Sequence, residues 1–286
     1  MKSEHAPEHI VGGQAVLEGV MMRRGDKVAT AIRKPDQEIA TREENFTSLT
    51  KRYKFLGLAV IRGFINLLEM LVLGMKVTLF SAESALERPQ KWSEVAIMLT
   101  ISLGFGVFLF IVVPAYCFSL LRASISSTIL LNVLEGCVRM GIFLGFLGIT
   151  LLMSDMKRLY MYHGAEHKTV FAWEAGKELT VENIRPFSTH HPRCGTSFLL
   201  FVMVISILVF SLLGRPDFVH RVIYKLLLFP VVAGISYEAI RYTGKHRNQG
   251  WVQVLSWPGL LLQKITTREP TDDMIEVAIA AMKKVV

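Results

Sequence analysis

The clearest chemical signal in this chain is a run of five residues, His163-Gly164-Ala165-Glu166-His167. On a helix, residues four apart share a face, so the two imidazoles would converge as the first two ligands of a zinc ion do. Glu166 then stands where a general base can take a proton from water, as in the H-x-x-E-H pattern of inverzincins. The run therefore predicts a helix with two metal ligands and one catalytic carboxylate.

A second group of metal-capable side chains, His190, His191 and Cys194, precedes the next apolar stretch. Imidazole and thiolate are both standard zinc ligands. Each group lies next to an apolar stretch, and the segment between these two stretches contains both groups. The two ends of that segment would therefore lie at the same face of the membrane. We therefore expect His191 or Cys194 to lie within about 5 Å of the ring nitrogens of His163 and His167. The competing interpretation is a solvated loop whose histidines bind nothing.

Composition places the chain among membrane proteins, because 51% of its 286 residues are hydrophobic and 20% are charged. The formal net charge of +8 indicates attraction to anionic membrane lipid. No nucleic-acid-binding module is recognisable, so no nucleic acid partner is expected. The polar first residues do not have the form of a cleavable signal peptide.

The apolar segments predict a mainly α-helical integral membrane protein with about four transmembrane helices. Four stretches have the length and the low charge of a membrane span: 95–121, 136–153, 197–213 and 222–240. They form a four-span membrane domain, 95–243, that includes the motif-bearing connection 155–196.

Residues 55–82 differ from these spans because they carry a polar stripe. Such a helix either lies in the interface as a partly buried amphipathic helix, or crosses as a fifth membrane helix with its stripe against the bundle. The positive-inside rule places the N-terminus, residues 155–196 and the C-terminus in the cytoplasm, because Lys and Arg cluster there. Five spans cannot place all three on one side, whereas four spans can, so we favour the first alternative. The stripe consists of Arg62, Asn66, Glu69, Leu73 and Lys76.

The flanking segments have patterns of their own. Residues 1–54 include short β-prone runs separated by turns between residues 10 and 46, which predict a small cytoplasmic β-meander. The tail, 244–286, begins with an aromatic-rich interfacial segment. It ends in a helix with Thr271 as its N-cap. The apolar stripe of this helix is Met274, Val277, Ala278, Ala281 and Val285.

Three strings, Gly12 to Met22, Tyr162 to Lys168 and His191 to Thr196, resemble the YqhQ-like family of bacterial multi-span membrane proteins. The resemblance extends over nearly the whole chain. It implies a multi-pass protein of the bacterial cytoplasmic (inner) membrane and a predicted metal-dependent enzyme. His190 lies outside the family-like string and is the less expected ligand.

The first functional hypothesis is a zinc-dependent hydrolase at the cytoplasmic face of the membrane. His163 and His167 would bind zinc or another divalent metal, and Glu166 would activate water. The third ligand would come from one of four side chains: His191, Cys194, Glu18 or Glu238.

The alternative is a non-enzymatic membrane factor. Here His163, His167, His191 and Cys194 close a four-ligand structural site, which leaves no position for a substrate water. The basic inner face would then dock a partner such as the protein-export or membrane-insertion machinery. Whether the chain is an enzyme stays open between these two.

A transporter is a third and weaker class. Carriers usually hold buried ionisable residues within their spans. Arg139 and Lys225 lie near span ends, where we expect them to snorkel to the interface.

Overall fold

The structure is a computed structural model that describes residues 11–86, 89–191, 194–246 and 249–286. It is mainly helical, with one small antiparallel sheet near the N-terminus. The strands are β1 (Val11–Val16), β2 (Gly19–Arg24), β3 (Lys27–Arg33) and β4 (Ile39–Asn45). The helices up to the first motif are α1 (Leu49–Arg52), α2 (Ile61–Leu86), α3 (Trp92–Val107), α4 (Val113–Leu121), α5 (Thr128–Thr150) and α6 (Ser154–Glu174). The others are α7 (Val181–Ile184), α8 (Thr196–Ser211), α9 (Phe218–Lys245), α10 (Gly250–Thr266) and α11 (Asp272–Val285).

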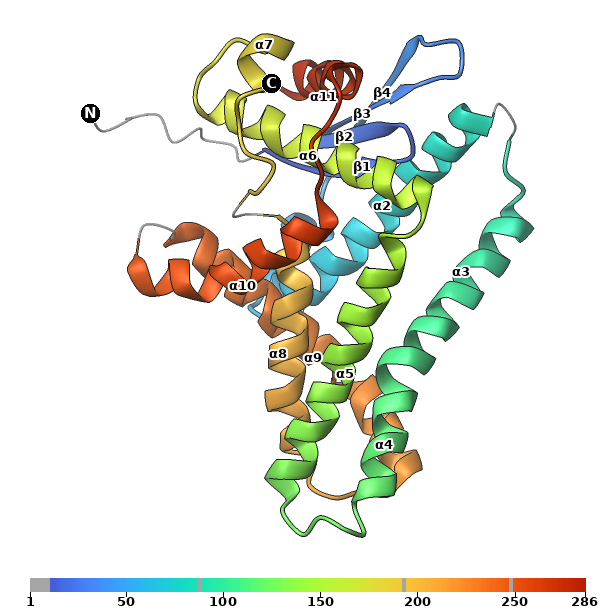
Figure 1. Cartoon of the computed structure of the whole chain (residues 1–286), viewed down its shortest axis with the longest axis vertical. Helices are drawn as coiled ribbons and strands as arrows, with labels where there is room; N and C mark the ends of the chain where they lie inside the picture. The colour runs from blue at the N-terminus through green and yellow to red at the C-terminus, as the bar shows by residue number, and fades with distance from the viewer. Residues whose placement is uncertain (1–10, 87–88, 192–193, 247–248) are drawn as a thin grey trace.

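The molecule has two parts, seen one above the other in Figure 1. The sheet, α6, α7 and α11 form one end. Helices α3, α4, α5, α8 and α9 run away from it as a bundle, and α10 projects sideways at the junction. The first motif is on α6, so it lies in the end that contains the sheet, close to where the bundle begins.

The sheet is the expected β-meander, with strand order β1-β2-β3-β4 and antiparallel pairing throughout. Its first hairpin closes at the pair Val16 and Gly19, which leaves a loop of only Leu17 and Glu18. Glu18 has a φ of 52°, in the left-handed region that tight hairpins require.

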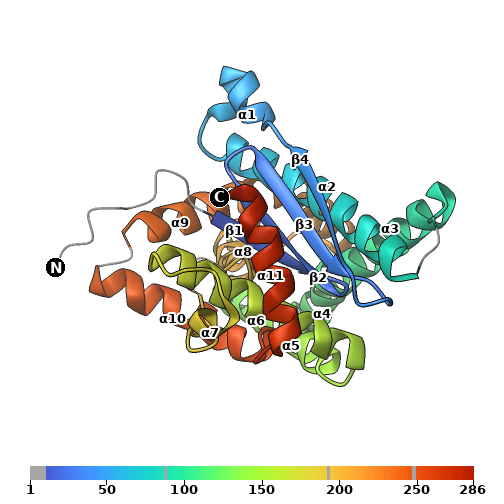
Figure 2. The same cartoon turned by 90° about the horizontal axis from the view of Figure 1, so that it is seen from above.

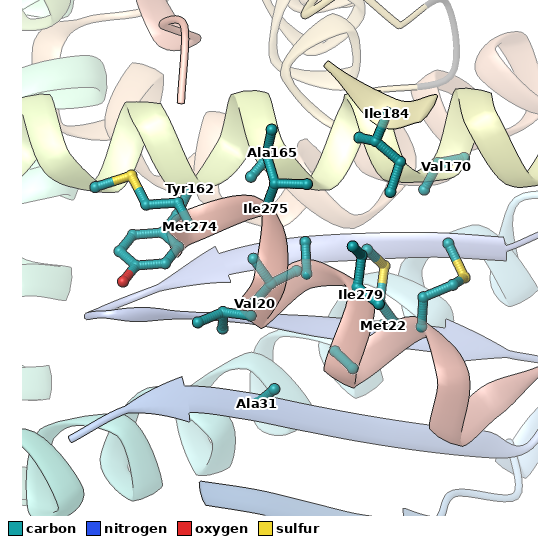
Figure 3. Packing of buried hydrophobic residues seen from close by; sticks show 14 of the residues in the cluster. Val20, Met22, Ala31, Tyr162, Ala165, Val170, Ile184, Met274, Ile275 and Ile279 are labelled. Carbon is teal, nitrogen blue, oxygen red and sulfur yellow. The ribbon is translucent and has the colours of Figure 1, made fainter. Parts of the chain in front are cut away.

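Both faces of the sheet are buried, because its strands alternate between two cores. Val20 and Met22 pack against α6 and α11, whereas Met21 packs against Leu73 of α2 on the opposite face. Figure 2 shows α11 crossing the sheet, and Figure 3 shows the side chains between the two. The expected apolar stripe of the C-terminal helix is confirmed, since all five of its residues are buried: Met274, Val277, Ala278, Ala281 and Val285.

Among the described residues, four helical segments are long and apolar enough to cross a membrane. This set differs from the expected four. It includes α2, and it omits α8, which is apolar but has only 16 residues. The four segments are Ile61–Ser84, Trp92–Leu121, Thr128–Thr150 and Phe218–Gly244.

Most side chains in the polar stripe of α2 form hydrogen bonds or ion pairs with other parts of the protein. Its first three members bond to α9 and to the segment before α2, whereas Lys76 is exposed. The contacts are Arg62 Nε to Glu238 Oε1 at 2.6 Å, Asn66 Nδ2 to the Tyr237 hydroxyl at 2.9 Å, and the Leu49 N–H to Glu69 Oε1 at 2.6 Å.

The expectation that Arg139 and Lys225 snorkel is wrong. Both are buried in the bundle, with Arg221, around the single carboxylate of Glu135 on α5. Lys225 forms an ion pair with Glu135, and Arg221 Nε donates to Glu135 Oε2 at 3.1 Å. Arg139 lies one helical turn away, with its NH2 group 3.7 Å from Glu135 Oε1. A shared internal carboxylate compensates the charge of these buried cations.

Candidate metal centre

The motif-bearing segment forms a helix, as its spacing predicts. Asp155 lies in the first turn of α6, where negative charge is favourable, and Gly176 ends it in the left-handed conformation with a φ of 64°. Tyr162 and Ala165 face the core against the sheet and α11. His163, Glu166 and His167 line a cavity next to this core.

Three metal-capable side chains meet in this cavity. His163 and His167 come from α6, and Cys194 comes from the connection just before α8. One ligand atom from each lies within 4.8 Å of the other two, and His163 Nε2 is 3.2 Å from Cys194 Sγ. The expected approach of Cys194 to the two histidines is confirmed. The two motifs therefore form one site.

Both imidazoles are held in the orientation of a metal ligand. His163 Nδ1 lies 2.8 Å from the Thr266 carbonyl, and His167 Nδ1 lies 2.5 Å from the Thr189 carbonyl. A carbonyl only accepts hydrogen bonds, so each Nδ1 carries the proton and each Nε2 keeps a lone pair. His167 Nε2 is buried and makes no hydrogen bond within the described part of the chain. Burial also lowers the pKa of His167, which favours the neutral form that binds metals.

Glu166 lies beside the ligands, outside the three-residue group. Its Oε2 is 3.6 Å from His167 Nε2 and 3.9 Å from His163 Nε2. Burial raises the pKa of Glu166, and the nearby main chain of Gly13 on β1 opposes this shift. Gly13 fits here because it has no side chain, since a Cβ would lie 2.7 Å from Glu166 Cγ.

His191 lies in the same cavity but outside the three-residue group. Its Nε2 is 3.7 Å from Glu174 Oε2. Its backbone is fixed by Gln263 of α10, whose side chain accepts from the His191 N–H and donates to the His191 carbonyl, both at 2.8 Å. The structure thus brings together three of the four expected ligands and holds the fourth next to them.

The other two side chains considered as third ligand are engaged elsewhere. Glu18 accepts from Arg158 Nε at 2.7 Å and from the Tyr162 hydroxyl at 3.2 Å, and the Arg158 guanidinium lowers the pKa of Glu18. Glu238 pairs with Arg62. Neither belongs to the three-residue group, in which Cys194 supplies the third ligand atom.

The cavity has a volume of about 380 Å³ and lies between β1, α6 and the start of the bundle. Apolar side chains and main chain make up most of its wall. The lining residues other than His163, Glu166, His167, His191 and Cys194 are Val11, Gly12, Gly13, Gln14, Ala15, Leu147, Leu159, Tyr160, Val170, Gly195, Thr196 and Thr266.

Comparison with known proteins places this site in a family. Residues 58–286 match the family described as "Protein of unknown function (DUF1385)". The chain belongs to the DUF1385 family. It is also 33% identical, over 99% of its length and 94% of the relative's, to "Uncharacterized protein YqhQ" of Bacillus subtilis (strain 168). No solved structure matches the chain.

The matched DUF1385 region contains all three ligands and Glu166, whereas β1 with Gly13 precedes it. Sequence reasoning assigned no role to Gly13, Thr189, Thr266 or Gln263, although all four fix the groups of the site. Thr189 and Thr266 act through their main-chain carbonyls, which every residue has, so the sequence does not single them out. Gly13 had one signal, its place in the first family-like string, but nothing connected that string with Glu166.

Proposed function

We propose that this DUF1385 protein is an integral protein of the bacterial cytoplasmic membrane with a metal-dependent hydrolase centre. One observation carries the proposal. The ligand atoms of His163, His167 and Cys194 lie within 4.8 Å of one another, with the Glu166 carboxylate beside them in a cavity.

The donor set fits a divalent metal and favours zinc. Two imidazole nitrogens and one thiolate are a combination found in catalytic zinc sites, which keep three protein ligands and one open position. A closed structural site would need a fourth ligand, and His191 is the residue expected to supply it. Its Nε2 lies near Glu174 and is not part of the three-residue group, which supports the open, catalytic form.

Each residue then has a defined part in hydrolysis. A bound divalent ion would supply Lewis acidity and lower the pKa of a coordinated water. Glu166, which packs against Gly13, accepts a proton from water that attacks the substrate. Val11, Leu147 and Val170 give the cavity apolar walls, which limit access of bulk water.

An open coordination position can be tested without knowing the substrate. A photoreactive hydroxamate, which chelates zinc through a free position, should label the zinc-loaded wild-type protein. His163→Ala should lose this labelling because a ligand is missing. His190→Ala is the matched control and should keep it, since His190 is not in the group.

Zinc binding without hydroxamate labelling would show a closed site and support the non-enzymatic factor instead. In that case the basic inner face would be the place to look for a partner such as the export or insertion machinery. Equal labelling of wild-type protein and His163→Ala would place the reactive metal elsewhere and contradict the proposal.

We further propose that the connection 155–196 faces the cytoplasm, because Lys and Arg gather there and at both flanks of the apolar segments. Ala175→Cys, at an exposed position, should resist an impermeant thiol reagent in intact cells and react after lysis. Cys117 and Cys137 are replaced by Ser in the same protein. Labelling of Ala175→Cys in intact cells would invert the orientation.

A further inference from the structure

We propose that the cavity takes an extended peptide segment, which pairs with the outer edge of β1 and is cleaved beside Glu166. The cleavage rests on the proposed hydrolase function, whereas the pairing needs no metal. The inference starts from the edge strand of the sheet, since β1 pairs only with β2 among the described strands and residues Val11 to Ala15 line the cavity.

The hairpin fixes which main-chain groups of β1 point outward. A loop of two residues is closed by a pair that exchanges hydrogen bonds, here Val16 and Gly19, and such pairs alternate along an antiparallel ladder. Val11, Gly13 and Ala15 therefore direct their N–H and carbonyl groups away from β2. Edge groups of this kind are the usual template for adding a peptide strand.

A second observation places the catalytic carboxylate beside this strand. Glu166 packs against Gly13, where an added Cβ would lie 2.7 Å from Glu166 Cγ. No backbone-to-backbone bond joins β1 to any described segment other than β2. At Gly12 an added Cβ would meet nothing within 4 Å, so the opposite face of β1 is open at this position. A peptide paired with β1 would thus run past the three ligands.

The wall of the cavity suits peptide side chains better than a phosphate headgroup. None of its described lining residues is Lys or Arg, whereas Leu147, Leu159 and Val170 offer apolar surface. Anionic headgroups are normally held by cations or clusters of N–H donors. An extended peptide presents alternate side chains to one wall, so apolar residues at every second position should be preferred.

The reaction that follows is ordinary amide hydrolysis. Water oxygen adds to the scissile carbonyl carbon, and Glu166 takes one proton from that water. Glu166 then passes this proton to the leaving nitrogen as the carbon–nitrogen bond breaks. The second water proton leaves the new carboxyl group for the released amine, so the products are a carboxylate and an ammonium ion, and no electron donor or acceptor is required.

Binding is measured with fluorescent, end-blocked synthetic peptides that carry apolar residues at alternate positions. The protein is full-length Glu166→Gln in lipid nanodiscs, which should bind without cleaving, and metal-free wild type is tested in parallel. Each peptide nitrogen is then methylated in turn. Methylation should weaken binding at every second position, by at least about fivefold for each lost hydrogen bond.

Ala15→Pro removes one outward N–H from an edge strand, where proline is tolerated, and should weaken binding to a similar degree with the metal content unchanged. If Ala15→Pro does not fold, the methylation scan still decides. The inference is overturned if methylation weakens binding without alternating from one position to the next, or if no peptide binds.

Cleavage separates this inference from the proposed function. Peptide products that require Glu166 and zinc support both. Peptide binding with the two-residue period but no hydrolysis keeps the pairing and rejects the hydrolase. Glu166-dependent hydrolysis of phospholipid vesicles, with no peptide bound, keeps the hydrolase and rejects the peptide as its substrate.

Discussion

Glu166→Gln is expected to leave the fold and the metal content intact while activity falls by about a hundredfold or more. Gln has nearly the size of Glu, and its side-chain oxygen still accepts hydrogen bonds. It cannot take a proton from water. The measurement is rescue of a strain that lacks the gene, with expression level and bound metal determined for the same cells.

Glu182→Gln is the matched control, because Glu182 is an exposed carboxylate of the same connection and lies outside the site. It should rescue as wild type does. Full rescue by Glu166→Gln at normal expression would contradict the hydrolase. Loss of rescue with metal retained would contradict a purely structural role for the centre.

Glu135→Gln is expected to destabilise the helix bundle by about 3–5 kcal/mol, the usual cost of leaving buried charge uncompensated. Glu135 is the carboxylate shared by Arg139, Arg221 and Lys225, and all four side chains are buried. The neutral amide keeps the shape and removes the charge. Thermal unfolding in detergent, followed by light scattering, measures the effect.

The control is Glu276→Gln, which removes the exposed partner of Arg33 in an ion pair at the surface and should cost at most about 1 kcal/mol. If Glu135→Gln does not accumulate, the double variant with Lys225→Gln should recover protein, because it removes one of the uncompensated cations. Equal melting temperatures for wild type and Glu135→Gln would show that the network does not stabilise the bundle.

The elements that follow a strong local period were predictable. The i, i+4 spacing of His163 and His167 indicated a helix with both rings on one face, and α6 has that form. The apolar stripe in the last helix predicted α11 and the side of it that is buried. The turns between residues 10 and 46 gave the β-meander. In each case a local pattern and the tertiary environment favour the same structure.

Long-range pairing was not predictable to the same degree. Lys225 looked like an interfacial cation because Glu135 becomes its partner only when α5 and α9 are packed. Arg139 lies four residues after Glu135 on the same helix, so this pairing is local. Likewise, His191 and Cys194 were equally good ligands in the sequence. The backbone bonds to Gln263 and the approach of Glu174 distinguish His191 from Cys194, and both depend on the tertiary fold.

The metal centre itself is the central claim, and elemental analysis of the purified protein tests it most directly. Protein prepared without chelator should contain about one zinc or similar divalent ion per chain. The His163→Ala, His167→Ala double variant should contain almost none, while His190→Ala should match wild type. Equal metal content in the wild type and the double variant, or no metal retained by wild type in the presence of added zinc, would contradict the claim.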